Sequence, residues 1–264
     1  MEFAVVCTAT LVVAALTLFS GFGLGTVLMP AFALFFPVPV AVGATAVVHL
    51  ANNLFKAVLV GRNADRHIVL RFALPAGLAA VAGGLLLELM SGAAPLTRYA
   101  LGDRVHEITP VKLVIAVLIV GFALLELAPR FDRLSFSPKY IPLGGVLSGF
   151  FGGLSGHQGA LRTAFLIRSG LGKEAFIGTT VVSAVVVDIM RLAVYGTTFL
   201  GGSPHSIFGT GQSAWPLVAA GTAAAFLGSF IGTRLVRKVT MRTIRVLVGI
   251  MLLLLGIALG AGLI

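Results

Sequence analysis

Charged residues are scarce in this sequence. Only 11% of its 264 residues are Asp, Glu, Lys or Arg, while 58% are hydrophobic and the mean hydropathy is +1.06. A water-soluble domain carries about a quarter charged residues. The composition therefore excludes an ordinary soluble domain and indicates an integral membrane protein.

Cysteine is nearly absent as well. Cys7 is the only one, which excludes an intrachain disulfide and a thiolate metal cluster, and we expect neither a metal nor a cofactor. The sequence also lacks the Gly-x-x-x-x-Gly-Lys-Ser/Thr, Gly-x-Ser-x-Gly and His-Glu-x-x-His patterns of nucleotide sites, serine nucleophiles and zinc proteases. An ATP-driven pump and an intramembrane enzyme are therefore not expected.

Acidic residues are the rarer kind of charge: nine Asp and Glu stand against 19 Lys and Arg, for a net charge of +10. Most of the basic residues lie in short connections between apolar stretches, where they control the orientation of membrane helices. This placement excludes nucleic acid as an expected partner. The lipid bilayer is the expected surrounding.

Ten apolar stretches follow one another along the chain. They lack the period-two alternation of a barrel strand, and the longer ones reach the length of about 20 residues that a spanning helix needs. The predicted fold class is therefore all-α integral membrane. The first stretch lacks the basic start of a signal peptide and is expected to be a membrane element. The stretches cover residues 3–19, 26–37, 40–60, 70–91, 109–128, 140–155, 159–169, 174–200, 213–233 and 242–264.

A glycine-broken apolar segment occurs twice, about half the chain apart. The first copy runs from Ser20 through Gly23 and Gly25, and the second runs from Ser148 to Gly159. Interrupted segments at corresponding positions of two halves are typical of transporters built from internal repeats. We therefore predict an internal duplication.

The connections that follow the two copies differ in charge. The second copy returns to a turn with Arg168 and Lys173, whereas the first returns to the uncharged residues 37–39. By the positive-inside rule the first turn lies outside and the second inside. The halves are then inverted, each with a Gly-broken re-entrant hairpin followed by three transmembrane helices, and both termini lie outside. The predicted boundaries are a first repeat over 1–128, a cytoplasmic linker over 129–139 and a second repeat over 140–264.

A Gly-rich break, a short helix and then an Ala-x-x-x-Thr helix occur in both halves. This pattern resembles the TauE/SafE sulfite exporter family of membrane transporters, over nearly the whole chain. The resemblance implies transport of small sulfur-containing anions, such as sulfite, sulfoacetate and other organosulfonates, across the bacterial inner (cytoplasmic) membrane. The second copy departs from the usual glycine run, reading Gly156-His157-Gln158-Gly159. The matching residues are Gly23, Leu24, Gly25, Pro30, Ala41 and Thr45, and then Gly153, Gly159, Ala175 and Thr179.

The helix breaks also predict an anion site from physical chemistry. A half-helix that begins inside the bilayer directs backbone N–H groups and a partial positive charge toward the middle of the membrane. Two such N-termini, near Gly25 and near Gly159, would converge on one anion from opposite sides. The alternative is that these glycines only permit tight packing or a kink.

Polar residues form a stripe on the helix expected over 40–60. His49, Asn52, Asn53 and Lys56 are spaced by three, four and seven residues and share one face. Ionisable side chains within a span face a pathway or a partner, because exposure to lipid costs about 3 kcal/mol or more. Lys56 lies near the helix end, so snorkelling to the interface is its alternative role.

The second half supplies further candidates. Asp188 and Arg191 are spaced to pair on one helix face, as substrate site or as a structural ion pair. His157 and Gln158 lie within the second break. Arg162 follows one turn later, and its fork suits an oxyanion; its alternative is a cytoplasm-facing charge.

These features predict a secondary transporter that works by alternating access around a midplane site. Its expected partner is a small anionic substrate, and its oligomeric state is open. We expect proton coupling, with His49, His157 and Asp188 as candidate proton carriers; a transporter or channel for another small carboxylate or anion is the alternative. The predicted substrate-binding residues are Gly23, Gly25, Thr45, His49, Asn52, Asn53, Lys56, His157, Gln158, Gly159, Arg162, Thr179, Ser183 and Arg191.

Overall fold

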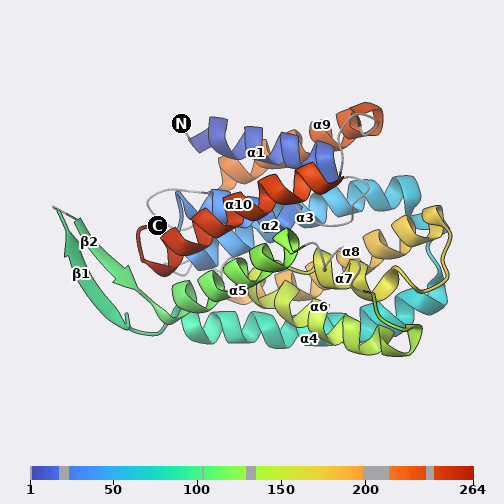
Figure 1. Cartoon of the computed structure of the whole chain (residues 1–264), viewed down its shortest axis with the longest axis horizontal. Coiled ribbons are helices and arrows are strands. Elements are labelled where there is room, and N and C mark those ends of the chain that lie inside the picture. The colour runs from blue at the N-terminus through green and yellow to red at the C-terminus, as the bar shows by residue number, and fades with distance from the viewer. Residues whose placement is uncertain (1, 18–23, 103, 129–134, 199–213, 236–240) are drawn as a thin grey trace.

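The structure is a computed structural model, and it describes residues 2–17, 24–102, 104–128, 135–198, 214–235 and 241–264. In this part of the chain the ten predicted apolar stretches are ten helices, arranged as one bundle (Figure 1). The prediction of a mainly helical membrane fold is confirmed. The helices are α1 (Glu2–Thr17), α2 (Leu24–Ala33), α3 (Val38–Val60), α4 (Arg66–Ser91), α5 (Pro110–Leu127), α6 (Ile141–Ser155), α7 (Gly159–Leu166), α8 (Lys173–Thr198), α9 (Trp215–Leu235) and α10 (Met241–Gly260).

Three described segments are long and apolar enough to cross a membrane, namely Val38–Asn63, Arg66–Ser91 and Lys173–Gly196. The outer surface of α4 is apolar, which indicates that it faces lipid and not water. Leu78 and Leu89 are among its exposed side chains, and a row of exposed leucines on a long helix is stable only against lipid.

A β-hairpin lies between α4 and α5, outside the predicted apolar stretches. Strands β1 (Thr97–Leu101) and β2 (Arg104–Ile108) pair antiparallel, and Arg98 Nε lies 2.8 Å from Glu107 Oε1 across the pair. Tyr99 OH donates to the Ala261 carbonyl, so the hairpin is attached to the C-terminal end of α10. The hairpin extends away from the bundle (Figure 1), and it is the exception to the all-α expectation.

The closest helix packing joins α4 and α6, which lie side by side. Gly145, Gly149 and Gly153 are spaced by four residues along α6 and face the backbone of α4. A Cβ atom at Gly149 would lie 1.9 Å from the Ala76 carbonyl oxygen, and one at Gly153 would lie 2.1 Å from that of Ala80. Because no side chain fits, these glycines allow the backbones to touch, as is common between membrane helices.

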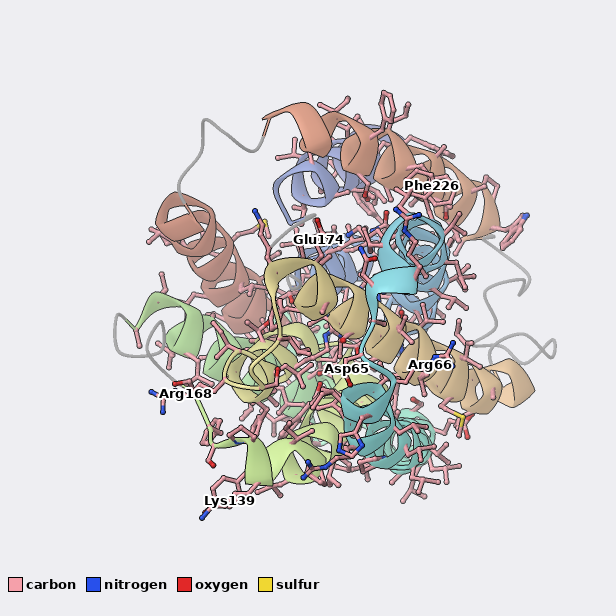
Figure 2. All side chains as sticks on the ribbon, turned by 90° about the vertical axis from the view of Figure 1, so that its right-hand side faces the viewer. Asp65, Arg66, Lys139, Arg168, Glu174 and Phe226 are labelled. Carbon is pink, nitrogen blue, oxygen red and sulfur yellow. The ribbon has the colours of Figure 1, made fainter. Side chains whose placement is uncertain are left out.

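The two ends of the bundle differ in charge. Arg66, Lys139 and Arg168 are spread over the face in Figure 2, where Asp65 and Glu174 also lie; this face is the end opposite to the β-hairpin of Figure 1. Arg66 begins α4, Lys139 lies just before α6, and Arg168 follows α7. All three lie at or near the short connections between apolar stretches. The bundle therefore has one basic end and one end that carries the hairpin and the C-terminus.

Candidate functional site

The polar stripe of α3 faces the interior of the bundle. His49, Asn52, Asn53 and Lys56 are all buried, whereas Val58, on another face of α3, is 84% exposed. The prediction that the four residues share an inward face is confirmed. Lys56 is only 7% exposed, so it does not snorkel out of the bundle.

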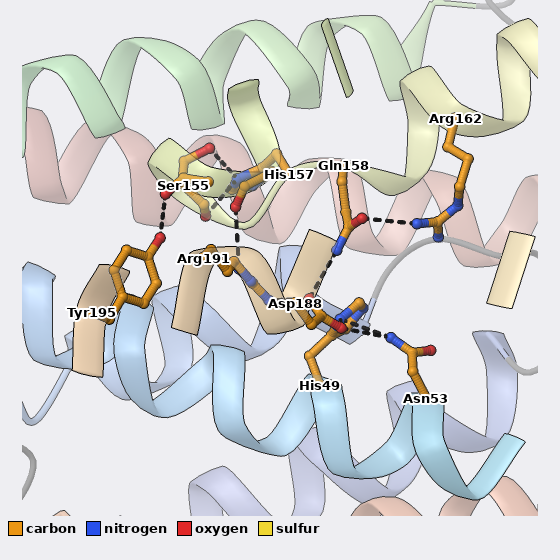
Figure 3. Close-up of polar contacts among 11 residues, drawn as sticks. His49, Asn53, Ser155, His157, Gln158, Arg162, Asp188, Arg191 and Tyr195 are labelled. Atoms are coloured by element: carbon orange, nitrogen blue, oxygen red, sulfur yellow. Dashed lines mark hydrogen bonds and ion pairs between the residues drawn. The ribbon is translucent and has the colours of Figure 1, made fainter. Parts of the chain in front are cut away.

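Asp188 on α8 is the hub of the polar contacts (Figure 3). Its Oδ2 lies 2.7 Å from His49 Nδ1 and accepts a hydrogen bond from Asn53 Nδ2 at 3.0 Å. Its Oδ1 accepts from Gln158 Nε2 at 3.0 Å and lies 2.8 Å from Arg191 Nη2. The predicted pairing of Asp188 with Arg191 is therefore present, and the carboxylate also joins α3 to the second helix break.

The second break lies at residues 156–158, between α6 and α7. Gly156 has φ 83°, in the left-handed region that favours glycine. The break removes the helical partners of the preceding carbonyl groups, which other donors must satisfy inside the membrane. Tyr195 OH donates to the Gly153 carbonyl. Arg191 Nη1 donates at 3.2 Å to the Gly152 carbonyl, which also accepts from the Gly156 N–H at 3.0 Å. Arg191 thus pairs with a carboxylate and also holds the end of α6.

Gln158 connects this hub to α7. Its Oε1 accepts a hydrogen bond from Arg162 Nη1 at 2.9 Å, and its main-chain carbonyl accepts from Ser148 Oγ at 2.8 Å. Arg162 is only 3% exposed, so it is not a surface charge beside Arg168. A continuous polar chain therefore runs from Asp188 through Gln158 to Arg162 (Figure 3).

The start of α2 meets the second break near His49. Gly25 lies in the first turn of α2, and a Cβ atom there would lie 3.1 Å from the Gly156 carbonyl oxygen and 3.5 Å from His49 Cδ2. Gly159 is buried at the start of α7. Gly23 lies outside the described residues. The first turn of α2 and the second break are thus adjacent in space although they are far apart in the sequence.

His157 lies apart from the Asp188 contacts. Its ring stacks on Phe122 of α5, with centroids 5.3 Å apart and an interplanar angle of 9°, and its Nδ1 lies 3.1 Å from Ser155 Oγ. These neighbours belong to α5 and the end of α6. The structure therefore gives His157 a packing position within the break.

Other predicted residues also lie outside the Asp188 contacts. Asn52 Oδ1 accepts from Ser229 Oγ on α9 at 2.8 Å, and Thr179 Oγ1 accepts from the Asp65 main-chain N–H at 3.0 Å. Thr45 and Ser183 are fully buried, and their hydroxyl groups have no hydrogen-bond partner among the described residues.

The sequence did not single out Tyr195, Ser148, Ser229 or Phe122 as contributors. Tyr195 follows Arg191 by four residues on α8, so helical spacing alone could have placed the two on one face. Ser148 was noted only as the start of the second copy. Nothing in the sequence pattern of α9 or α5 marks Ser229 or Phe122.

The buried charges do not balance. Among residues whose burial the structure describes, Lys56, Arg162 and Arg191 are the buried Lys and Arg side chains, and Asp188 is the buried carboxylate. Buried charge is costly without compensation. With both histidines neutral, the cluster carries two surplus positive charges. Such a site favours an anion.

Metal binding has no comparable support. Among the described residues, no group of three His, Cys, Asp or Glu side chains is placed to hold a metal ion.

Helix ends that meet inside the bundle at a buried, positively charged polar cluster are typical of membrane transporters. The chain belongs to the sulfite exporter TauE/SafE family, whose model matches residues 6–259. Members of this family are membrane transporters, and the resemblance found in the sequence is confirmed. No curated protein and no solved structure matches the chain.

Proposed function

We propose that this protein is a secondary transporter of small sulfur-containing anions, such as sulfite, sulfoacetate and other organosulfonates, across the bacterial cytoplasmic membrane. The observation that carries the proposal is the surplus of buried positive charge formed by Lys56, Arg162 and Arg191 against Asp188. Of these cations, Arg191 lies against Gly156, whose carbonyl approaches Gly25 at the start of α2. Membership of the sulfite exporter family favours sulfur-containing anions among the possible substrates.

We propose further that the two halves, α1–α5 and α6–α10, are inverted repeats. In such a repeat, α1 corresponds to α6 and α4 corresponds to α9. The packing of α4 against α6 should therefore have a counterpart in the packing of α9 against α1. Gly145 lies against Phe72 and Gly153 against Ala80, so α4 and α6 run in the same direction. An exchange predicts the same direction for α1 and α9.

The pair α1 and α9 supports this exchange. Gly221 lies next to Val6 and Gly228 next to Leu11, so these helices also run in the same direction. Exchanging the halves turns α3 into α8 and α5 into α10, so each of these two pairs is mapped onto itself. The helices of each pair also pack against each other. A two-fold relation within the membrane plane accounts for all four pairs.

The orientation follows from charge. Arg66, Lys139 and Arg168 lie at one end of the bundle (Figure 2), and the positive-inside rule assigns that end to the cytoplasm. The β-hairpin and the C-terminus then face outward. The N-terminal end of α1 lies at the same end of the bundle as the C-terminus in Figure 1, which supports an outward N-terminus.

Alternating access is the proposed mechanism. His49, Lys56, Arg162, Asp188 and Arg191 are all buried, so the cluster is enclosed from both sides of the bundle. An enclosed site between two similar halves is the intermediate expected when each half closes in turn over a bound anion.

Proton coupling is proposed to use His49 and Asp188. Their side chains lie 2.7 Å apart, and Asn53 donates to the same carboxylate oxygen. A histidine beside a buried carboxylate can change charge during a transport cycle. A proton on this pair would offset part of the charge of an anion that enters.

Uptake into proteoliposomes tests the proposal. Purified protein should take up sulfite and sulfoacetate, faster with an imposed pH gradient, and His49→Leu and Arg162→Leu should remove this uptake. Acetate in a parallel assay tests the alternative of a general carboxylate transporter. Transport of neither sulfur anion would overturn the proposal.

A further inference from the structure

A pocket of about 350 Å³ lies at the basic end of the bundle, beside the connection between α3 and α4. The 3-10 helix η1 (Gly61–Asn63) is part of this connection, and Figure 2 labels the neighbouring Arg66. The described lining residues include none that contacts Asp188, so the pocket is separate from the buried cluster. Among the residues that line it are Arg62 of η1, Arg66 and Leu70 of α4, and Val182 of α8.

The two arginines of the pocket have no anionic partner among the described residues. Both are exposed, and neither side chain makes a hydrogen bond or a salt bridge within this part of the chain. Asp65 lies between them in the sequence, but its Oδ1 caps α4 by accepting from the Ile68 N–H at 2.9 Å. Guanidinium groups suit phosphate because their planar forks donate to two oxygens at once. The pocket therefore offers two cations to a phosphate from outside the chain.

Arg66 stands at the end of an apolar row on α4. Leu70, Leu74 and Leu78 follow it at intervals of four residues and are all exposed, so they form one row on the outer surface of the helix. A cation at the end of a lipid-facing row marks the boundary between the hydrocarbon and the headgroups. Arg66 is thus at the depth of the lipid phosphates.

Arg62 has the same relation to α3. Leu54 and Val58 are exposed and precede it by eight and four residues. The pocket therefore lies between the ends of two apolar rows, with an arginine at the end of each. Its other lining residues, such as Val69 and Val182, are apolar, so the site combines two cations with an apolar wall.

We propose that this pocket binds an anionic phospholipid from the leaflet at the basic end of the bundle. The phosphate pairs with Arg62 and Arg66, and the acyl chains lie along the exposed rows of α3 and α4. Basic pockets between membrane helices bind anionic headgroups by the same combination of charge and position. The site does not depend on which substrate the protein transports.

Two phospholipids with the same acyl chains test the headgroup. Dioleoyl phosphatidylglycerol carries a net negative charge, whereas the choline of dioleoyl phosphatidylcholine cancels the charge of its phosphate. Native mass spectrometry of the full chain in detergent measures the binding of each lipid. We expect phosphatidylglycerol to bind its first site at least about tenfold more tightly, since each nearby cation favours an anionic headgroup.

Two double variants locate the site. Arg62→Gln with Arg66→Gln removes both pocket cations and should weaken phosphatidylglycerol binding by about tenfold or more. Lys139→Gln with Arg168→Gln removes two exposed cations from the same end of the bundle, outside the pocket (Figure 2). This control should bind the lipid within about twofold of the unmodified protein, because exposed charges at a distance are screened. All four side chains are exposed, so both variants should fold, and their melting temperatures check this.

The outcomes are distinct. Equal binding of the two phospholipids to the unmodified protein would overturn the proposal, whether or not the variants fold. An equal loss in both double variants would assign the effect to overall charge and would also contradict it. Glycerol 3-phosphate offers the phosphate without acyl chains; if it displaces phosphatidylglycerol at equal concentration, the ligand is a free phosphate and the lipid assignment is wrong. None of these measurements uses anion uptake, so a failure of the proposed function would leave their result intact.

Discussion

The start of α2, which follows the first break, and the second break approach each other but supply different chemistry. Beside the first break, Gly25 has no side chain and allows the backbone of α2 to come close to the second break. A Cβ atom at this position would lie only 3.1 Å from the Gly156 carbonyl oxygen. At the second, Gln158 and Arg162 contribute side chains, and Arg191 and Tyr195 secure the end of α6.

Under the proposed duplication, the two copies of the element have diverged in role while keeping their position. Among the described residues, α2 has an apolar composition, with Thr26 as its hydroxyl side chain, whereas α7 carries Arg162 and Thr163. We expect the first break to set the space available to the anion and the second to set its charge and hydrogen bonding. The substitutions below test this division.

Replacing Asp188 should have the largest effect. Asp188→Ala leaves Arg191 buried without its carboxylate and removes the acceptor of Asn53 and Gln158, so we expect a loss of about 3–5 kcal/mol in stability. Thermal unfolding of the purified protein in detergent measures it. Glu174→Ala removes an exposed carboxylate from the same helix and serves as the control; equal melting temperatures for both variants would contradict the hub role.

Gly149→Ala should be the next most damaging. Its methyl group would lie 1.9 Å from the Ala76 carbonyl oxygen, and separating the two backbones should cost about 1–3 kcal/mol. The same unfolding assay applies. Gly121→Ala on α5 adds a methyl with nothing within 4 Å and should not destabilise. A variant at Gly149 as stable as the one at Gly121 would show that α4 and α6 can separate freely.

Gly25→Ala should affect transport more than stability. The added methyl would lie 3.1 Å from the Gly156 carbonyl and 3.5 Å from His49 Cδ2, so the neighbours must shift by a few tenths of an ångström. We expect sulfoacetate uptake to fall by about tenfold, equivalent to about 1.4 kcal/mol, with little change in melting temperature. Unchanged uptake would remove the first break from the site.

Ser229→Ala should have the smallest effect. It removes the 2.8 Å hydrogen bond to Asn52 Oδ1, at a cost of about 1 kcal/mol. Because this contact joins α3 to α9 and does not reach Asp188, sulfoacetate uptake should stay within about twofold of that of the unmodified protein, which is less than about 0.5 kcal/mol. A loss of about tenfold or more would place Asn52 within the substrate site.

Much of the helical framework could be predicted because membrane helices carry their own signal. The ten apolar stretches correspond to α1–α10, since each must satisfy its backbone hydrogen bonds internally. The β-hairpin was missed because two strands of five residues each, outside the apolar stretches, give a weak signal. The boundaries proposed for the two repeats and the linker over 129–139 stay predictions.

Part of the site could also be predicted. Regular spacing placed His49, Asn53 and Lys56 on one face, and the i,i+3 spacing paired Asp188 with Arg191, because both patterns are local to a helix. Spacing could not show that Asn52 bonds to α9, that Thr179 accepts from Asp65, or that His157 stacks on Phe122. Those contacts join segments far apart in the sequence.

The sequence by itself determined the solvent, the helices, the two breaks and the asymmetric distribution of charge, because hydropathy, helical periodicity and glycine act within a few residues. Only the tertiary structure decided that Gly25 meets Gly156, that Asp188 joins α3 to the second break, and that Lys56 and Arg162 are both buried in the bundle. These follow from how the helices pack, since the partners of a buried charge are set by neighbours in space. The surplus of charge became visible when burial separated the interior cations from those at the surface.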